Sequence, residues 1–288
     1  MTGAEPVVDP AYAAARSVLL DALDALSAHR QALILVGAQA VYLRTGAAGL
    51  TVAPHTTDGD VAIDPSLLGG DPTLEVAMRQ RGFDLHTRAD GGIEPGTWLG
   101  VTEVGAQRYS VPIDLLVPAA VLAGGATRGA RLPVHGKRAA KRTPGIEAAL
   151  VDHDEMTVTA LAPGDDRHST VAVAGVGALL VAKAIKLTDR VAGSRPHRLV
   201  DKDAGDVLRL VRATPVATMA ARFATLGDHP VAGPVTRTAT EALAALFRSP
   251  ESPGVVMAVR SVEHDLPAIQ VEAQLTGYVR ELRRRIDL

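Results

Sequence analysis

The stretch ALILVGAQAVYLR, residues 32–44, decides the expected fold. Its short apolar run ends at Gly37 and is followed by helix-forming residues, so the pattern predicts a buried strand, a glycine turn and a helix. Apolar residues at helical spacing predict another helix before it, over residues 11–29. DVAID, residues 60–64, predicts the next strand. Strands that alternate with helices indicate an α/β sheet domain.

The rest of the chain continues this alternation and then becomes mostly helical. The next predicted elements are a helix at 73–82 and strands at 109–118, 156–162 and 170–174. From residue 175 onward the apolar spacing is typical of helices. We therefore expect an α/β domain over residues 1–168 and a helical domain over residues 169–288.

The composition excludes several classes of function. The 288 residues are 47% hydrophobic with a formal net charge of −2, which argues against an unselective nucleic-acid coat protein. There is no cysteine, so disulfides, thiolate zinc sites and cysteine nucleophiles are excluded. The N-terminus lacks the pattern of a secretion signal, and the longest apolar run is too short to span a bilayer. We expect a cytoplasmic protein with no membrane partner.

Three aspartates crowd the stretch HTTDGDVAID, residues 55–64. On an extended chain Asp58 and Asp60 face the same side about 6.6 Å apart, close enough to converge on divalent ions. Asp64 lies about 13 Å beyond Asp60 and is expected to be a strand-end residue. Turn capping is the competing interpretation, because Thr-Asp-Gly is common in turns.

A later acid favours the metal-site interpretation. Asp114 interrupts the apolar strand VPIDLLVP, where an unpaired charge would be costly, so a base or a metal ion is expected beside it. Gly37 ends a strand and begins a helix, an arrangement whose free backbone N–H groups suit phosphate binding. Many α/β loops contain one such glycine, so this signal is weak by itself.

In this order, the segments resemble the nucleotidyltransferase superfamily, whose pattern is hG[GS], a helix, [DE]h[DE]h and a third acid. The second half resembles the AbiEii / MenT-type nucleotidyltransferase toxins of type IV toxin–antitoxin systems. The residues that carry this likeness are AKAIKLTDR, residues 182–190, and RPHRLVDKDAGDVLRL, residues 195–210. The resemblance spans roughly residues 30 to 212. It departs from the family at Ala38, where a second glycine or a serine is usual, and at Gly59, where an apolar residue is usual.

The resemblance implies an α+β fold, with a polymerase-β-like mixed-sheet domain followed by a helical domain that completes the cleft. It implies that Asp58, Asp60 and Asp114 hold Mg²⁺ (or Mn²⁺) on an NTP substrate, because hard cations prefer carboxylate oxygens. The metal ions would stabilise an in-line attack on the α-phosphate, and Asp114 would help to deprotonate the attacking hydroxyl. Gly37, Ala38 and Gln39 would bind the nucleotide phosphates. Arg44 would either contact phosphate or only extend its aliphatic stem over an apolar surface.

A stripe of cations and two acids complete the implied site. Lys183, Lys186 and Arg190 follow each other at helical spacing, and they would neutralise triphosphate oxygens or form a solvated helix face. Lys183 matches the family lysine slightly better than Lys186. Asp206 matches the late catalytic aspartate, with Asp203 able to serve instead; an i,i+4 pair with Lys202 is the structural alternative for Asp206.

The resemblance implies that the acceptor is the 3′ end of a tRNA and that a cognate antitoxin protein is a possible partner. An acid-free basic stretch at residues 124–142 and a cluster of arginines at residues 280–285 could steer RNA phosphates. Two other functions remain open: transfer to a small molecule such as an antibiotic or to a protein, and a non-catalytic nucleotide-binding scaffold.

Overall fold

The computed structural model describes residues 8–46, 48, 50, 57–122, 124, 127–193 and 201–286. The N-terminal half contains α1 (Pro10–Ala25), η1 (Ser27–Ala32), β1 (Leu33–Val36), α2 (Gly37–Thr45), β2 (Gly59–Ile63), α3 (Leu74–Gln80), β3 (Asp84–Thr87), β4 (Ile93–Val104), β5 (Gln107–Pro118), η2 (Ala119–Val121), β6 (Lys141–Thr143), η3 (Glu147–Leu150), β7 (His153–Thr159) and β8 (His168–Ala174). The rest contains α4 (Val176–Ala192), α5 (Lys202–Ala213), α6 (Val216–Asp228), α7 (Ala232–Phe247), α8 (Pro253–Ser261) and α9 (Ala268–Ile286). The molecule is therefore α+β, with a mixed sheet followed by a helical region.

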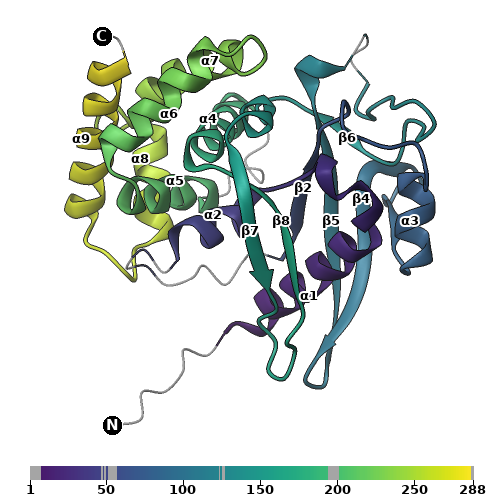
Figure 1. Cartoon of the computed structure of the whole chain (residues 1–288). Coiled ribbons are helices and arrows are strands. Elements are labelled where there is room, and N and C mark those ends of the chain that lie inside the picture. The colour runs from purple at the N-terminus through teal and green to yellow at the C-terminus, as the bar shows by residue number, and fades with distance from the viewer. Residues whose placement is uncertain are drawn as a thin grey trace.

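The strands form one mixed sheet within the described part of the chain. Its order is β3-β4-β5-β2-β1-β8-β7, and β6 pairs with β5 off this path. β1 is antiparallel to β2 and parallel to β8, while β2 is parallel to β5. Figure 1 shows α1 across the sheet and α5 to α9 gathered beside it, with α2 and α4 between these two parts.

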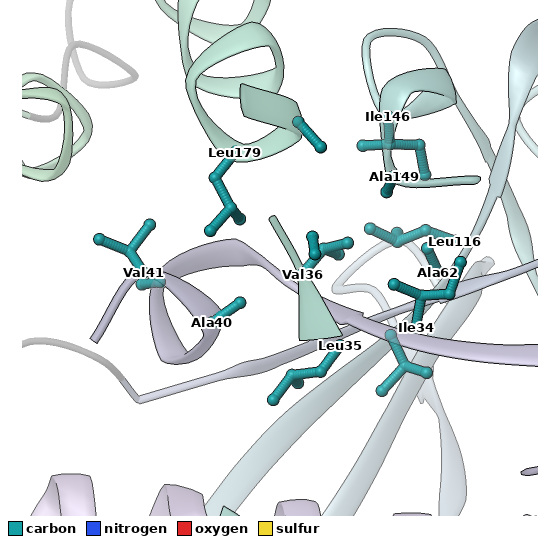
Figure 2. Packing of buried hydrophobic residues seen from close by; sticks show 14 of the residues in the cluster. Ile34, Leu35, Val36, Ala40, Val41, Ala62, Leu116, Ile146, Ala149 and Leu179 are labelled. Atoms are coloured by element: carbon teal, nitrogen blue, oxygen red, sulfur yellow. The ribbon is translucent and has the colours of Figure 1, made fainter. Parts of the chain in front are cut away.

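Alternation along the central strands determines which residues share a face. Ile34 pairs with Ala62, which in turn pairs with Leu116, so these three side chains point to the same side. Figure 2 shows them packed with Ile146 and Ala149 from the η3 region. The opposite face is covered by α1, whose apolar side chains are almost all buried. Asp60 and Asp114 belong to the first of these faces, since they lie two residues before Ala62 and Leu116.

The structure moves the expected division of the chain. The predicted boundary after residue 168 falls at the start of β8, which is an internal strand of the sheet between β1 and β7. The helical region begins instead with α4, at Val176. Leu179 of α4 packs beside Val36 and Val41 of the glycine-turn segment (Figure 2), so the helical region and the sheet share one apolar core.

Candidate functional site

The paired acids lie on one wall of a cavity of about 760 Å³. Asp58 directly precedes β2 and Asp60 is its second residue, and both carboxylates line this cavity. Asp64 follows the end of β2, and its Oδ1 accepts hydrogen bonds from the backbone N–H and the hydroxyl of Ser66. The expectation that Asp64 is a strand-end residue apart from the other two is confirmed.

The glycine turn lies directly against Asp60. Gly37 begins α2 with a φ of 71°, and a Cβ atom there would lie 2.1 Å from Oδ2 of Asp60. Only glycine combines this backbone conformation with such a close approach. Ala38, the next residue, lines the cavity. The turn thus places the N-terminal end of α2 at the acid pair.

Gly59, which separates the two acids, packs on the opposite face of the sheet. A Cβ atom there would lie 2.7 Å from Cδ1 of Ile113 and 3.3 Å from Cδ1 of Leu19 on α1. The glycine therefore allows α1 to pack closely under β2. Because Asp58 and Asp60 point away from that contact, Gly59 is compatible with their convergence on the cavity.

Asp60 is in an electrostatically unusual position. Burial raises the pKa of its carboxyl, and the neighbouring Asp58 raises it further. Lys186, Lys141 and Lys183 act in the opposite direction without reversing the shift. A cation placed between the two carboxylates would relieve their repulsion.

Asp114 lies next to Asp60 but is already paired. The two residues are direct partners in the parallel register of β2 and β5. Oδ1 of Asp114 accepts a hydrogen bond from the hydroxyl of Thr97 at 2.7 Å, and Oδ2 accepts one from the ammonium of Lys141 at 2.5 Å. Of the two partners expected for this strand acid, a base or a metal ion, the structure provides the base.

The helical wall of the cavity is built on one buried aspartate. Lys183 of α4 donates hydrogen bonds to Asp203 at 2.7 Å and to Asp206 at 2.5 Å, and all three side chains are at most 5% exposed. Lys186 lies 3.3 Å from the same Asp203 carboxylate, and Arg190 pairs with its other oxygen. The stripe of cations on α4 therefore converges on α5 and is not a solvated helix face.

Lys183 and Asp203 stabilise each other's charged form. Burial by itself would lower the pKa of Lys183, but the carboxylates of Asp203 and Asp206 outweigh it and raise this pKa above its usual value. Burial would raise the pKa of Asp203, and Lys183, Lys186 and Arg190 together bring it well below its usual range. Lys186 differs from Lys183 in accessibility, because its side chain is 48% exposed at the cavity.

Two further cations line the cavity. Burial lowers the pKa of Lys202, which lies close enough to Asp58 and Asp206 for their charges to oppose this shift. Arg209 is buried, with its guanidinium carbon 5.1 Å from the ring centroid of Tyr42. The rim is completed by residues around the end of α8, namely Arg260, Ser261, Val262, Glu263, His264 and Asp265.

Two predicted nucleotide ligands have structural partners. Gln39 is buried; its carbonyl oxygen accepts from Nε of Arg16 at 2.7 Å, and its amide donates to the backbone carbonyl of Asp58 at 3.0 Å. Arg44 donates to the carbonyls of Val173 and Ala174 and pairs with Asp154 at the far end of α2. Gln39 thus supports the acid pair from behind, and Arg44 joins α2 to β8 away from the cavity lining.

The basic stretch is only partly available to a polyanion. Arg142 donates to the carbonyls of Ala119 and Leu122, Lys141 pairs with Asp114, and Arg128 pairs with Glu94. Arg131, Lys137 and Arg138 are exposed, as is the paired Arg128. All four arginines of the C-terminal cluster are exposed, and two of them, Arg284 and Arg285, pair with Glu281. Residues 194–200, which belong to the second family-like segment, lie outside the described residues.

The donor set fits a divalent cation at the acid pair. Asp58 and Asp60 offer the carboxylate oxygens that Mg²⁺ and Mn²⁺ prefer, and their repulsion favours a cation there. Within the described ranges, no three acidic or histidine side chains are grouped so that they could hold one ion together. Asp114, predicted as a metal ligand, has its two oxygens engaged by Thr97 and Lys141.

Sequence reasoning missed the pairing of Lys141, which it placed in the basic stretch at residues 124–142 that could steer RNA phosphates. Nothing in the sequence connects it with Asp114, which is 27 residues away. Among the residues that the structure describes, no helix is both long and apolar enough to cross a membrane.

No family model and no curated protein matches this chain. Among solved structures, the chain is similar to JHP933 from Helicobacter pylori, with 10% sequence identity and a TM-score of 0.43. The match covers 95% of this chain and 92% of that chain. At this level of similarity, the function has to be inferred from the site itself.

Proposed function

We propose that the protein is a metal-dependent nucleotidyltransferase that transfers NMP from an NTP to an acceptor hydroxyl and releases pyrophosphate. The acceptor in this proposal is the 3′ end of tRNA, and the protein acts as the toxin of a toxin–antitoxin pair. The observation that carries the proposal is the composition of one cavity. An acid pair beside a glycine turn forms one wall, and cations held by buried aspartates form the other. The cavity thus combines a cation site with an anion site.

Each wall suits one part of a nucleoside triphosphate complexed with a metal ion. Asp58 and Asp60 would hold Mg²⁺ or Mn²⁺, which neutralises phosphate oxygens and favours attack at phosphorus when bound. The half-exposed ammonium of Lys186 is the cation on α4 best placed to meet phosphate oxygens. The N-terminal end of α2, from Gly37 and Ala38, adds backbone donors to the same region.

Lys183 contributes in a different way from Lys186. Its ammonium is buried between Asp203 and Asp206, so it fixes α4 against α5 while its positive charge remains at the cavity wall. Preorganised charges of this kind stabilise a transition state without reorganising during the reaction. Lys202 adds another cation close to Asp58, on the first turn of α5.

The acceptor assignment rests on the resemblance and on exposed basic residues. Arg131, Lys137 and Arg138 project from the loop before β6, and Arg280 and Arg283 from α9. Exposed cations of this kind attract RNA phosphates without sequence preference. Because the described residues that line the cavity include none of them, they would hold the body of the acceptor and not its reacting end.

The test is transfer of label from each NTP to defined acceptors. The protein is incubated with Mg²⁺ or Mn²⁺, with one of the four NTPs labelled at the α-phosphate, and with tRNA, a protein extract or small hydroxyl compounds. We expect label in tRNA, and no label when the tRNA has been oxidised with periodate, which destroys the terminal ribose diol. Label in a protein or a small molecule would contradict the acceptor, and absence of transfer to every acceptor by a folded protein would contradict the activity.

A further inference from the structure

Asp114 is held in place by two neighbours, one on each of its carboxylate oxygens. Thr97, its direct partner on β4, donates to Oδ1 at 2.7 Å. Lys141 on β6 donates to Oδ2 at 2.5 Å. The side chain of Asp114 is 22% exposed and that of Lys141 is 16% exposed. The ammonium of Lys141 compensates the carboxylate charge at this strand position.

The backbone around Lys141 is fixed by buried contacts. The indole N–H of Trp98 donates to the carbonyl of Ala139 at 2.9 Å, and the N–H of Ala130 donates to the carbonyl of Ala140 at 2.9 Å. Lys141 itself pairs with Leu116 in the parallel ladder of β5 and β6. The backbone of Lys141 is therefore held in the sheet, which directs its side chain toward Asp114.

The same ammonium also acts on Asp60. Asp60 and Asp114 are register partners on the same face of the sheet, so the ammonium that pairs with Asp114 also lies close to Asp60. The ammonium of Lys141 thus occupies the position that a second divalent ion would need in order to contact both Asp60 and Asp114. Two like charges a few ångströms apart repel strongly in a partly buried site, so an ammonium and a metal ion exclude each other there.

We infer that the ammonium of Lys141 takes the place of a metal ion at Asp114. The site therefore binds one divalent cation, held by Asp58 and Asp60. Asp114 is a positioning residue that holds the ammonium in place. The choice of ion rests on the proposed nucleotidyltransferase function. Lys141 then supplies a fixed positive charge beside the reaction centre, and Asp114 keeps it directed toward Asp60.

The test is the stoichiometry of Mn²⁺ binding to the nucleotide-free protein, measured by the electron paramagnetic resonance signal of free Mn²⁺. We expect one bound ion in the wild type and its loss in Asp60→Asn. Asp114→Asn should keep the ion with roughly 10- to 100-fold lower affinity, as for a residue outside the coordination shell. Lys141→Met should gain a second ion at the released Asp114, and Lys141→Arg should restore the stoichiometry of one.

Thermal unfolding followed by circular dichroism shows whether each variant is folded. If Lys141→Met does not fold, the number of ions bound by Lys141→Arg still tests the inference. Two ions in the wild type, or loss of the ion in Asp114→Asn as complete as in Asp60→Asn, would overturn the inference. Absence of Mn²⁺ binding by the wild type would overturn it as well. The measurement contains no nucleotide and no acceptor, so one bound ion without nucleotide transfer would contradict the proposed function and leave this inference standing.

Discussion

Gly37 and Asp60 occupy adjoining space: a Cβ atom on Gly37 would lie 2.1 Å from Oδ2 of Asp60. The contact arises because Val36, the last residue of β1, pairs with Asp60 on β2. The chain then turns away through a glycine with a φ of 71°. The turn and the acid pair are thus one structural unit, and a side chain at position 37 has to displace the carboxylate.

Substitution of Gly37 tests this unit directly. Both Gly37→Ala and Gly46→Ala place alanine at a positive φ, 71° and 53°, and each should lower the free energy of unfolding by about 1–3 kcal/mol. Only Gly37→Ala also displaces Asp60, since nothing lies within 4 Å of a Cβ atom at Gly46. We expect Mn²⁺ affinity to fall in Gly37→Ala and to be retained in Gly46→Ala, by titration. Equal affinity in both variants would contradict the proposed contact.

The buried ion pairs of Lys183 make it the most sensitive cation for stability. Lys183→Met leaves Asp206 without the ammonium 2.5 Å away, and it should lower the free energy of unfolding by about 3–5 kcal/mol in urea denaturation. Lys186→Met removes a 48% exposed side chain and should cost less than about 1 kcal/mol. In the pair Lys183→Met and Asp206→Asn, the double variant should be more stable than the sum of the two single losses predicts. Additive losses would show that the two side chains do not depend on each other.

Gln39 should affect activity through the backbone of Asp58. Gln39→Glu keeps an acceptor for Arg16 and loses the donor to the Asp58 carbonyl, so the fold should persist while nucleotide transfer falls roughly 10- to 100-fold. Gln39→Leu loses both bonds and should also lower the free energy of unfolding by about 1–3 kcal/mol. Transfer at the wild-type rate by Gln39→Glu would show that this hydrogen bond does not position the acid pair.

His135 should make stability depend on pH. Its Nδ1 accepts a hydrogen bond from the N–H of Leu74, and its Nε2 lies 2.9 Å from the carbonyl of Gly69, so the neutral ring fits this place. Burial lowers the pKa of His135, and His29, whose ring centroid is 5.8 Å away, lowers it further. As pH falls below 6.5, the unfolded chain therefore binds more protons than the folded one. The free energy of unfolding then decreases with falling pH until the lowered pKa of His135 in the folded state is reached.

Urea unfolding between pH 7.5 and pH 5 measures this dependence, with the range chosen to include the unperturbed histidine pKa of about 6.5. His135→Gln should flatten the slope of the free energy of unfolding against pH. The control is His264→Gln, because His264 is 94% exposed and should leave the slope as it is. An unchanged slope in His135→Gln would assign the pH dependence to other groups.

The sequence allowed several parts of the site to be predicted because they are local. Apolar spacing and one glycine predict the strand, the glycine turn and the helix at residues 33–45. Strand alternation predicts that the side chains of Asp58 and Asp60 point to the same side of the sheet. β4 was not predicted, because Pro95, Gly96 and Gly100 interrupt its β pattern.

Long-range pairing was not predictable in the same way. Nothing local connects Lys141 with Asp114, since the register of β5 and β6 brings them together only in the folded sheet. The convergence of Lys186 and Arg190 on Asp203 likewise depends on how α4 packs against α5. The family resemblance implies Gln39 as a phosphate ligand, yet its partners in the structure are Arg16 and the backbone of Asp58.

The most direct test of the central claim compares two aspartates of the same stretch. Asp60 lines the cavity, whereas Asp64 caps the turn at Ser66, and asparagine can keep that cap. Transfer of α-labelled NMP to tRNA is measured for the wild type, Asp60→Asn and Asp64→Asn, with folding checked by circular dichroism. We predict loss of transfer in Asp60→Asn and wild-type transfer in Asp64→Asn. Transfer by folded Asp60→Asn at the wild-type rate would contradict the claim that this acid pair is the catalytic centre.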